Sequence, residues 1–157
     1  MIERELYRHR QIGWTMILSA AAPVLVLALL LPHATPNAGA LAGHIQQIWI
    51  VPAVIVGLVT LVFSSLQVVV TSQVLQISFG PGFIKRRWPI ADIEATALIR
   101  TSVANGWGIR RRDGSTLYNV SGFDAVAITL KEGRSVMVGS DDAAQLKRAI
   151  ESARARH

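Results

Sequence analysis

The longest stretch without charged side chains sets the main constraint on this fold. Residues 11–84 contain no Asp, Glu, Lys or Arg, so every charged residue lies in the first ten positions or from Lys85 onward. Within this stretch, residues 12–31 and 45–66 are two almost wholly apolar runs. A helix of about 20 residues rises about 30 Å, the thickness of the hydrocarbon core of a bilayer. The two runs are therefore predicted to be transmembrane helices.

The segments that flank the two runs predict an orientation. Residues 32–44, rich in Pro, Gly, Ala and Asn, are predicted to be an external loop, and they contain no Lys or Arg. The N-terminal segment 1–11 contains three arginines, and a basic run follows the second apolar run. Because positive residues stay on the cytoplasmic side, both termini are predicted to be cytoplasmic. The alternative for the first run is a cleaved signal peptide, but its length and the acidic residues before it favour a retained helix.

From residue 67 onward the sequence is typical of strands and turns. Residues rich in Val, Ile, Thr and Phe alternate with polar residues, which predicts about seven strands. These strands are expected at 67–80, 83–90, 93–103, 106–112, 115–121, 125–131 and 134–140. Asp113-Gly114 and Glu132-Gly133 predict two tight hairpins, the first of which would pair Arg112 with Ser115.

The end of the chain predicts an amphipathic helix over residues 141–155. Ser140 is a suitable N-cap, and an apolar stripe at helical spacing follows it, made of Ala143, Leu146, Ile150 and Ala153. Antiparallel strands joined by short turns leave two open sheet edges. A mainly β barrel of antiparallel strands, with the helix across one open end, is therefore the predicted fold of residues 67–157.

The phrases "GWGIRRRDGSTLYNVSG" and "AVAITLKEGRSVMVGSDD", with the helix after them, carry a resemblance to a known family. They resemble an uncharacterised group of bacterial membrane proteins that join one or two spans to a pleckstrin-homology-like (PH-like) domain. The resemblance implies a two-helix transmembrane hairpin followed by a cytoplasmic PH-like domain, in the bacterial inner membrane. Lipid-binding PH domains hold phosphates with Lys and Arg in and after the first inter-strand loop. The matching stretch here is "FGPGFIKRRW", with Lys85 and Arg87 on one strand face.

Two basic runs are the candidate binding surface. They are Lys85, Arg86 and Arg87, and Arg110, Arg111 and Arg112. One interpretation is a surface for anionic lipid or for a protein partner, since an exposed cation near a negatively charged leaflet contributes about 1 kcal/mol. The other is a solvated strand face that also sets membrane topology. The sequence leaves both open.

The sequence predicts no catalytic residue, no metal site and no cofactor. Cysteine is absent, and His33 and His44 have no acidic or thiol side chain at ligand spacing. The net charge of +6 suits phosphate partners, but the aromatic residues are typical of strand packing, so no nucleic-acid partner is expected. The predicted function is a membrane-anchored, non-enzymatic PH-like module that presents a cytoplasmic surface to a protein partner or to anionic lipid headgroups. The alternative is an accessory subunit of a membrane protein complex, with the transmembrane hairpin as the main contact.

Overall fold

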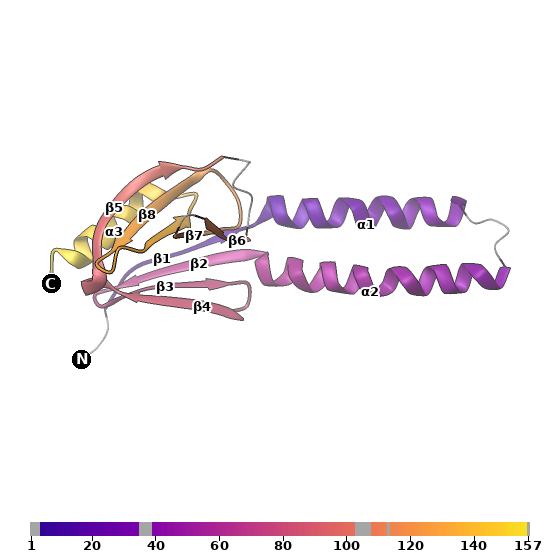
Figure 1. Ribbon diagram of the computed structural model, residues 1–157, viewed down its shortest axis with the longest axis horizontal. Helices are drawn as coiled ribbons and strands as arrows, with labels where there is room; N and C mark the ends of the chain where they lie inside the picture. The colour runs from indigo at the N-terminus through magenta and orange to yellow at the C-terminus, as the bar shows by residue number, and fades with distance from the viewer. Residues whose placement is uncertain (1–3, 35–38, 103–107, 113, 157) are drawn as a thin grey trace.

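Two antiparallel helices project from one end of a module that contains two β-sheets and a third helix (Figure 1). The computed structural model describes residues 4–34, 39–102, 108–112 and 114–156. Within these ranges, the side chains of residues 27, 28, 30–34, 39–50 and 112 are not described. The described chain begins and ends at the end of the module that is farthest from the helical hairpin (Figure 1).

The helical hairpin is inserted between two paired strands. The chain runs through β1 (Glu5–Ile12), α1 (Trp14–Ala34) and α2 (Gly39–Phe63) into β2 (Ser65–Thr71). Strands β1 and β2 are antiparallel neighbours, and the N–H of Gly13 donates to the carbonyl oxygen of Ser64 at 2.7 Å, where α1 begins and α2 has ended. Residues 5–11 of the N-terminal segment, which was predicted only to be cytoplasmic, therefore belong to the edge strand of a sheet.

The prediction of two transmembrane spans is contradicted. The apolar runs do form helices, but Ile12 belongs to β1 and Leu66 to β2, so strands take up the module-side end of each predicted span. In the part of the chain that the structure describes, no helix is long and apolar enough to cross a membrane. This finding overturns two further predictions. One is that the protein is integral to a membrane through two spans, and the other is that it lies in the bacterial inner membrane with both termini in the cytoplasm. The predicted loop at 32–44 is also too long, since residues 32–34 and 39–44 are helical.

The first sheet has four strands in the order β1-β2-β3-β4. The predicted strand at 67–80 is in fact a hairpin of β2 and β3 (Val74–Phe79), turned at residues 72 and 73. The hydroxyl of Thr71 stabilises this turn, because it accepts a hydrogen bond from the N–H of Val74 at 3.0 Å. Strand β4 (Ile84–Pro89) follows and pairs antiparallel with β3.

The second sheet has five strands in the order β5-β8-β9-β7-β6. A short 3-10 turn, Ile90–Asp92, leads from the first sheet into this one. The strands are β5 (Ile93–Arg100), β6 (Gly108–Arg112), β7 (Ser115–Asn119), β8 (Asp124–Leu130) and β9 (Ser135–Gly139). Strand β9 returns between β8 and β7, so it pairs antiparallel with β8 but parallel with β7.

The predicted seven-stranded antiparallel barrel is therefore wrong. The described residues form nine strands in two separate sheets, and no ladder joins one sheet to the other. Two features of the chain cause the difference. The N-terminal strand β1 adds an edge strand to the first sheet. In the second sheet, β7 pairs parallel with β9, so the strands do not follow a simple antiparallel meander.

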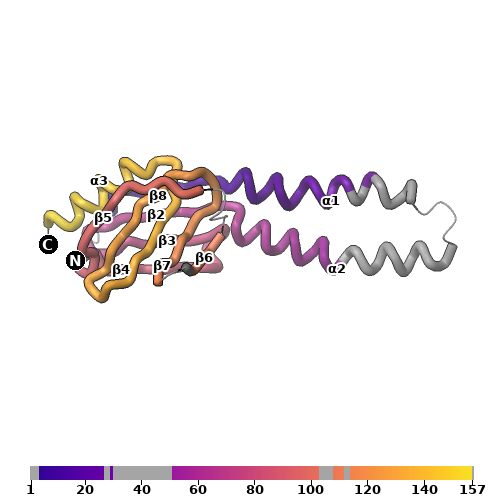
Figure 2. Tube along the Cα trace, turned by 45° about the horizontal axis from the view of Figure 1, so that its top comes forward, coloured from indigo at the N-terminus to yellow at the C-terminus, as the bar shows by residue number. Residues whose placement is uncertain are grey.

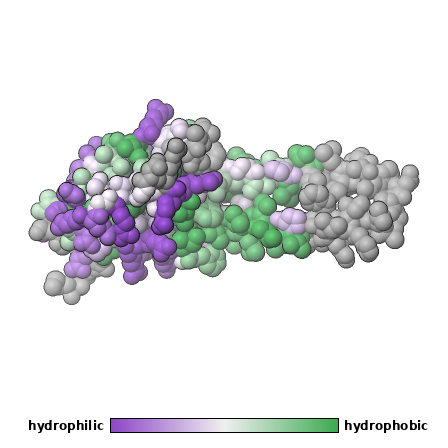
Figure 3. All heavy atoms as spheres, viewed as in Figure 1, coloured by the Kyte–Doolittle hydropathy of each residue, from purple (hydrophilic) through white to green (hydrophobic). Residues whose placement is uncertain are grey.

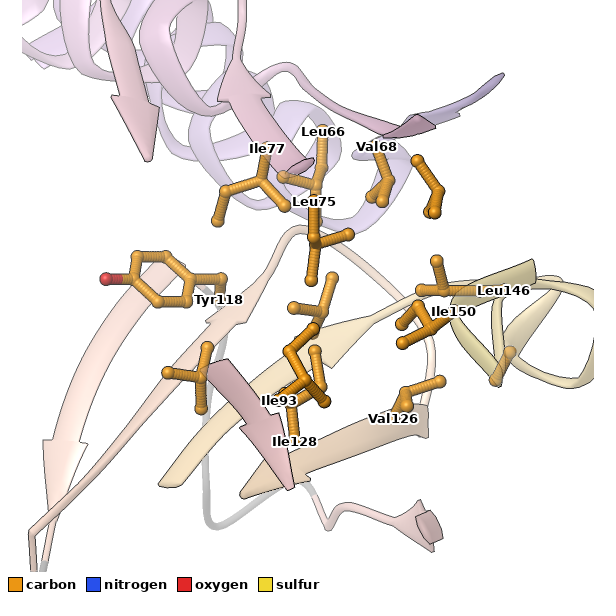
Figure 4. Close-up of a cluster of buried hydrophobic side chains, with 14 of the residues drawn as sticks. Leu66, Val68, Leu75, Ile77, Ile93, Tyr118, Val126, Ile128, Leu146 and Ile150 are labelled. Carbon is orange, nitrogen blue, oxygen red and sulfur yellow. The ribbon is translucent and has the colours of Figure 1, made fainter. Parts of the chain in front are cut away.

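The hydrophobic core lies between the two sheets (Figure 4). The first sheet contributes the alternate residues Leu66, Val68, Val70, Leu75, Ile77 and Phe79, all buried. Side chains of the second sheet, among them Val126 and Ile128, meet them from the other side. Helix α3 (Ala143–Arg154) packs against β1 and β2 and against β5 and β8, so it closes one side of the sandwich (Figure 2).

The predicted C-terminal helix is confirmed as α3. Its four predicted apolar residues, Ala143, Leu146, Ile150 and Ala153, are all buried. The predicted N-cap is wrong by two residues, because Asp142 caps the helix by accepting from the N–H of Gln145 at 3.4 Å. The hydroxyl of Ser140 accepts from the N–H of Asp142 instead, and this bond holds the turn that leads into the helix.

The hairpin between β6 and β7 has the predicted register. Arg112 pairs with Ser115 and Arg110 with Leu117. Asp113, the first residue of the predicted turn, lies outside the described residues, whereas Gly114 has a φ of 78°. A hairpin also forms at Glu132-Gly133, but its loop is one residue longer than predicted, because Thr129 pairs with Ser135 and the N–H of Leu130 donates to the carbonyl oxygen of Arg134.

The substitution Gly114→Val is expected to destabilise the protein by about 1–2 kcal/mol, the cost of a left-handed backbone for an L-residue. A Cβ atom at position 114 would meet nothing within 4 Å, so the backbone conformation is the only source of the loss. Chemical denaturation of the full-length protein measures it. Gly114→Asn is the matched control, because asparagine tolerates the left-handed region. Equal losses for Val and Asn would contradict this explanation.

Candidate functional site

The first predicted basic run lies on β4, the edge strand of the four-stranded sheet. Lys85, Arg86 and Arg87 are all exposed. Because side chains alternate across a strand, Arg86 shares the inner face with the half-buried Ile84 and Trp88, and Lys85 and Arg87 lie on the outer face. The run is therefore divided between two faces of the sheet.

The second predicted basic run lies on β6, the edge strand of the other sheet. Arg110 and Arg111 are exposed and, as neighbours in a strand, lie on opposite faces; the side chain of Arg112 lies outside the described atoms. Strands β4 and β6 belong to different sheets and share no ladder. The structure therefore does not join the six predicted residues into one continuous strand surface.

The outer face of the four-stranded sheet instead brings Lys85 and Arg87 together with two arginines of β1. Strand pairing lines up Arg10, Gln67, Ser78 and Lys85 in one row across the four strands. The next row on the same face consists of Arg8, Val69, Gln76 and Arg87. We call the surface made by these eight residues the basic face. Its four cations are exposed and occupy the two edge strands.

Neutral groups orient two of the cations of the basic face. The guanidinium of Arg87 donates through Nε to Oε1 of Gln76 at 2.6 Å. Arg10 donates through Nε and Nη2 to the hydroxyl of Ser65 at 3.2 and 3.1 Å. A neutral acceptor positions a guanidinium without cancelling its charge. Both arginines therefore remain able to bind an anion.

One carboxylate accompanies the basic face. Glu5 accepts from Nε of Arg8 at 2.9 Å, and this hydrogen bond lowers the pKa of the Glu5 carboxyl below its usual value. Glu5 thus stays ionised and offsets part of the charge of Arg8. Among the described residues, the other three cations of the face, Arg10, Lys85 and Arg87, form no ion pair with a carboxylate.

No local pattern in the sequence places Arg8 and Arg10 on this surface. They lie on a strand whose partner, β2, is separated from it by both helices of the hairpin. The inner residues of β1 are mostly polar as well: His9 contacts Asp141 near the start of α3 at 2.5 Å, and Gln11 donates to Ser121. No hydrophobic alternation therefore marks the segment as a strand.

The helical hairpin forms a second candidate surface, and it is apolar. Large exposed side chains occur on both helices, including Leu18, Leu25, Val51, Leu58 and Leu61. Figure 3 shows apolar side chains over the described part of the two helices, and hydrophilic side chains gathered over the sheets. The apolar surface of the molecule thus lies on the helical hairpin, and the charged surface lies on the β module.

The described residues of these surfaces offer no metal centre. In the residues that the structure describes, no group of three or more His, Asp or Glu side chains could hold a metal ion. No protein-family model, curated protein or solved structure matches this chain. The resemblance to bacterial PH-like proteins stays a prediction.

Proposed function

We propose that this chain is a non-enzymatic binding protein that docks into a larger protein assembly through its helical hairpin. The β module then presents its charged surface beside the assembly. This proposal keeps the accessory-subunit interpretation and assigns the main contact to α1 and α2. Its partner is a protein with apolar helices of its own.

The apolar surface of the hairpin is the observation that carries the proposal. Leu25 on α1 is 62% exposed and Leu58 on α2 is 58% exposed, and similar side chains surround both. Single exposed apolar residues are ordinary, but a contiguous patch is typical of an interaction site. A helix that is apolar all round is normally buried in its working state.

The partner that covers the hairpin must come from outside the described chain. Helices α1 and α2 contact each other on one side only, and the β module meets them at their base (Figures 1 and 2). A Cβ atom added at Gly57 would meet nothing within 4 Å, so this glycine faces away from α1. Glycine allows a close backbone approach, and Val54 and Leu61 on the same side of α2 are exposed. These features suit a neighbouring helix.

Cysteine-directed crosslinking in intact cells tests the proposal. The chain has no cysteine, so a single introduced cysteine carries the reagent at a known position. Leu25→Cys and Leu58→Cys are expected to give discrete adducts with another polypeptide. Phe83→Cys and Leu98→Cys are matched controls, because these apolar side chains lie on the β module and are 69% and 54% exposed. The controls are expected to give far fewer adducts.

Three results would contradict the proposal. Adducts confined to Phe83→Cys and Leu98→Cys would make the β module the main contact. Adducts of twice the chain's mass would identify a second copy as the partner. Hairpin adducts with lipid acyl chains alone would exclude a protein as the partner of the helices.

A further inference from the structure

We infer that the basic face binds an acidic α-helix of a partner protein, laid along the strands between the two edge cation pairs. This inference goes beyond the proposed docking of the hairpin and does not depend on it. The basic face lies on the outer side of the four-stranded sheet, whereas the second sheet and α3 pack against its inner side.

The width of the face fits a helix. Neighbouring strands lie about 4.8 Å apart, so β1 and β4, separated by three spacings, are about 14 Å apart. An α-helix with its side chains is about 10–12 Å across. A helix on the central strands β2 and β3 would therefore have Arg8 and Arg10 along one flank and Lys85 and Arg87 along the other.

The spacing along the strands fits a helix as well. The two rows of the basic face are two residues apart, which is about 6.6 Å in a strand. Acidic residues at positions i and i+4 of a helix are separated by a rise of about 6 Å. One carboxylate pair on each side of the helix would thus meet both cations of that flank.

The centre of the face is suited to hydrogen bonding and close contact. Gln67, Gln76 and Ser78 provide polar groups there, and Val69 provides the apolar one. These side chains are only partly exposed or buried, whereas the flanking cations are exposed. The mostly polar side chains at the centre therefore project less than the cations at the two edges. A helix can contact the centre of the face and the cations of both edges at the same time.

The composition of the face favours a protein over a nucleic acid. Single-stranded nucleic acid is normally held by aromatic side chains on which the bases stack. None of the eight residues of the basic face is aromatic, and the aromatic residue of β4, Trp88, packs inward at 5.7 Å from the ring centre of Tyr118. The carboxylates of an acidic helix match the two pairs of separated cations in sign and in spacing.

Fluorescence anisotropy with the full-length protein tests the inference. The probe is a labelled helical peptide of about 20 residues, long enough to be helical in water. Its glutamates follow i, i+4 spacing along two flanks. A second peptide has the same composition with the glutamates spread around the helix, and oligo-dT represents single-stranded nucleic acid. The flanked peptide is expected to bind tightest, and its binding to weaken with salt, because charges are screened beyond about 8 Å at physiological ionic strength.

Three double variants with the same change in net charge locate the site. Arg10→Glu/Lys85→Glu reverses one cation on each flank and is expected to weaken peptide binding about tenfold or more, since like charges across an interface repel strongly. Arg110→Glu/Arg111→Glu alters the other basic strand, and Arg100→Glu/Arg148→Glu alters exposed cations on β5 and α3. These two variants are expected to change the affinity for the peptide less than about threefold, which is well under 1 kcal/mol, because exposed charges outside the contact contribute little to binding.

The outcomes separate this inference from the docking of the hairpin, which the peptide assay does not measure. Equal weakening by all three variants would overturn it, because net charge alone would then govern binding. Equal binding of the two peptides, or tighter binding of oligo-dT, would also overturn it. Thermal unfolding checks that each variant is folded, and Arg8→Gln/Arg87→Gln, which only removes charge from the basic face, replaces Arg10→Glu/Lys85→Glu if that variant is not.

Discussion

Gly139→Ala is expected to lower the free energy of unfolding by about 3 kcal/mol, the upper end of the usual cost of overpacking a core. Gly139 ends strand β9 against the side chain of Asn119 on β7. A Cβ atom at position 139 would lie 2.3 Å from Oδ1, 2.6 Å from Cγ and 3.0 Å from Cβ of Asn119. Contacts this short require the asparagine side chain to move.

Asn119 cannot move without breaking the turn that follows β7. Its Nδ2 donates to the carbonyl oxygen of Gly122, and its Oδ1 accepts from the N–H of Ser121, both at 3.2 Å. The same turn binds the base of the helical hairpin, since Nε2 of Gln11 donates to the carbonyl oxygen of Ser121 at 2.9 Å. The extra methyl group should therefore loosen β7 and the hairpin junction together.

A double-mutant cycle with Asn119→Ala assigns the effect to this contact. Asn119→Ala alone should destabilise the protein by about 1–3 kcal/mol, because it leaves the half-buried N–H of Ser121 without its acceptor. In that background the clash is absent, so Gly139→Ala should cost much less than in the native protein. If Gly139→Ala is as costly with Asn119→Ala as without it, the clash is not the cause.

The parts of the fold that the sequence predicted are those encoded by local patterns. The α3 stripe follows the helical period, with Leu146 and Ile150 buried where the spacing places them. The turn at Gly114 fixes the register of β6 and β7, because a two-residue loop leaves one pairing. Both signals lie within a few residues of the structure they specify.

The parts that the sequence did not predict depend on residues far apart in the chain. Strand β1 is stabilised by its ladder with β2 and by the contact of His9 with Asp141, which lies 132 positions away. The parallel pairing of β7 with β9 also skips a strand, so no turn signal reports it. The basic face could be predicted only in part for the same reason. Lys85 and Arg87 belong to one basic run of the sequence, whereas Arg8 and Arg10 reach the same face only through three strand ladders.

The junction between β1 and α1 is the second place where one methyl group should have a large effect. Gly13→Ala is expected to cost about 2–3 kcal/mol, because its neighbours are parts of the backbone that cannot rotate away. A Cβ atom at position 13 would lie 2.9 Å from the carbonyl oxygen of Phe63 and 3.2 Å from both Cβ and the carbonyl oxygen of Val120. Phe63 ends α2, so the clash would push the two helices apart at their base.

Gly57→Ala is the matched control for Gly13→Ala, and the two changes should have opposite signs. Position 57 lies inside α2 with open space around it, so alanine there should stabilise the helix by about 0.5–1 kcal/mol. Amide hydrogen exchange gives the site-specific measurement, since the N–H of Gly13 donates to the carbonyl oxygen of Ser64 at 2.7 Å. The residue 13 amide should exchange faster in Gly13→Ala and at the native rate in Gly57→Ala. Native exchange in Gly13→Ala, with unchanged stability, would mean that the base of the hairpin has room for a side chain and that close backbone packing does not hold the helices to the sheets.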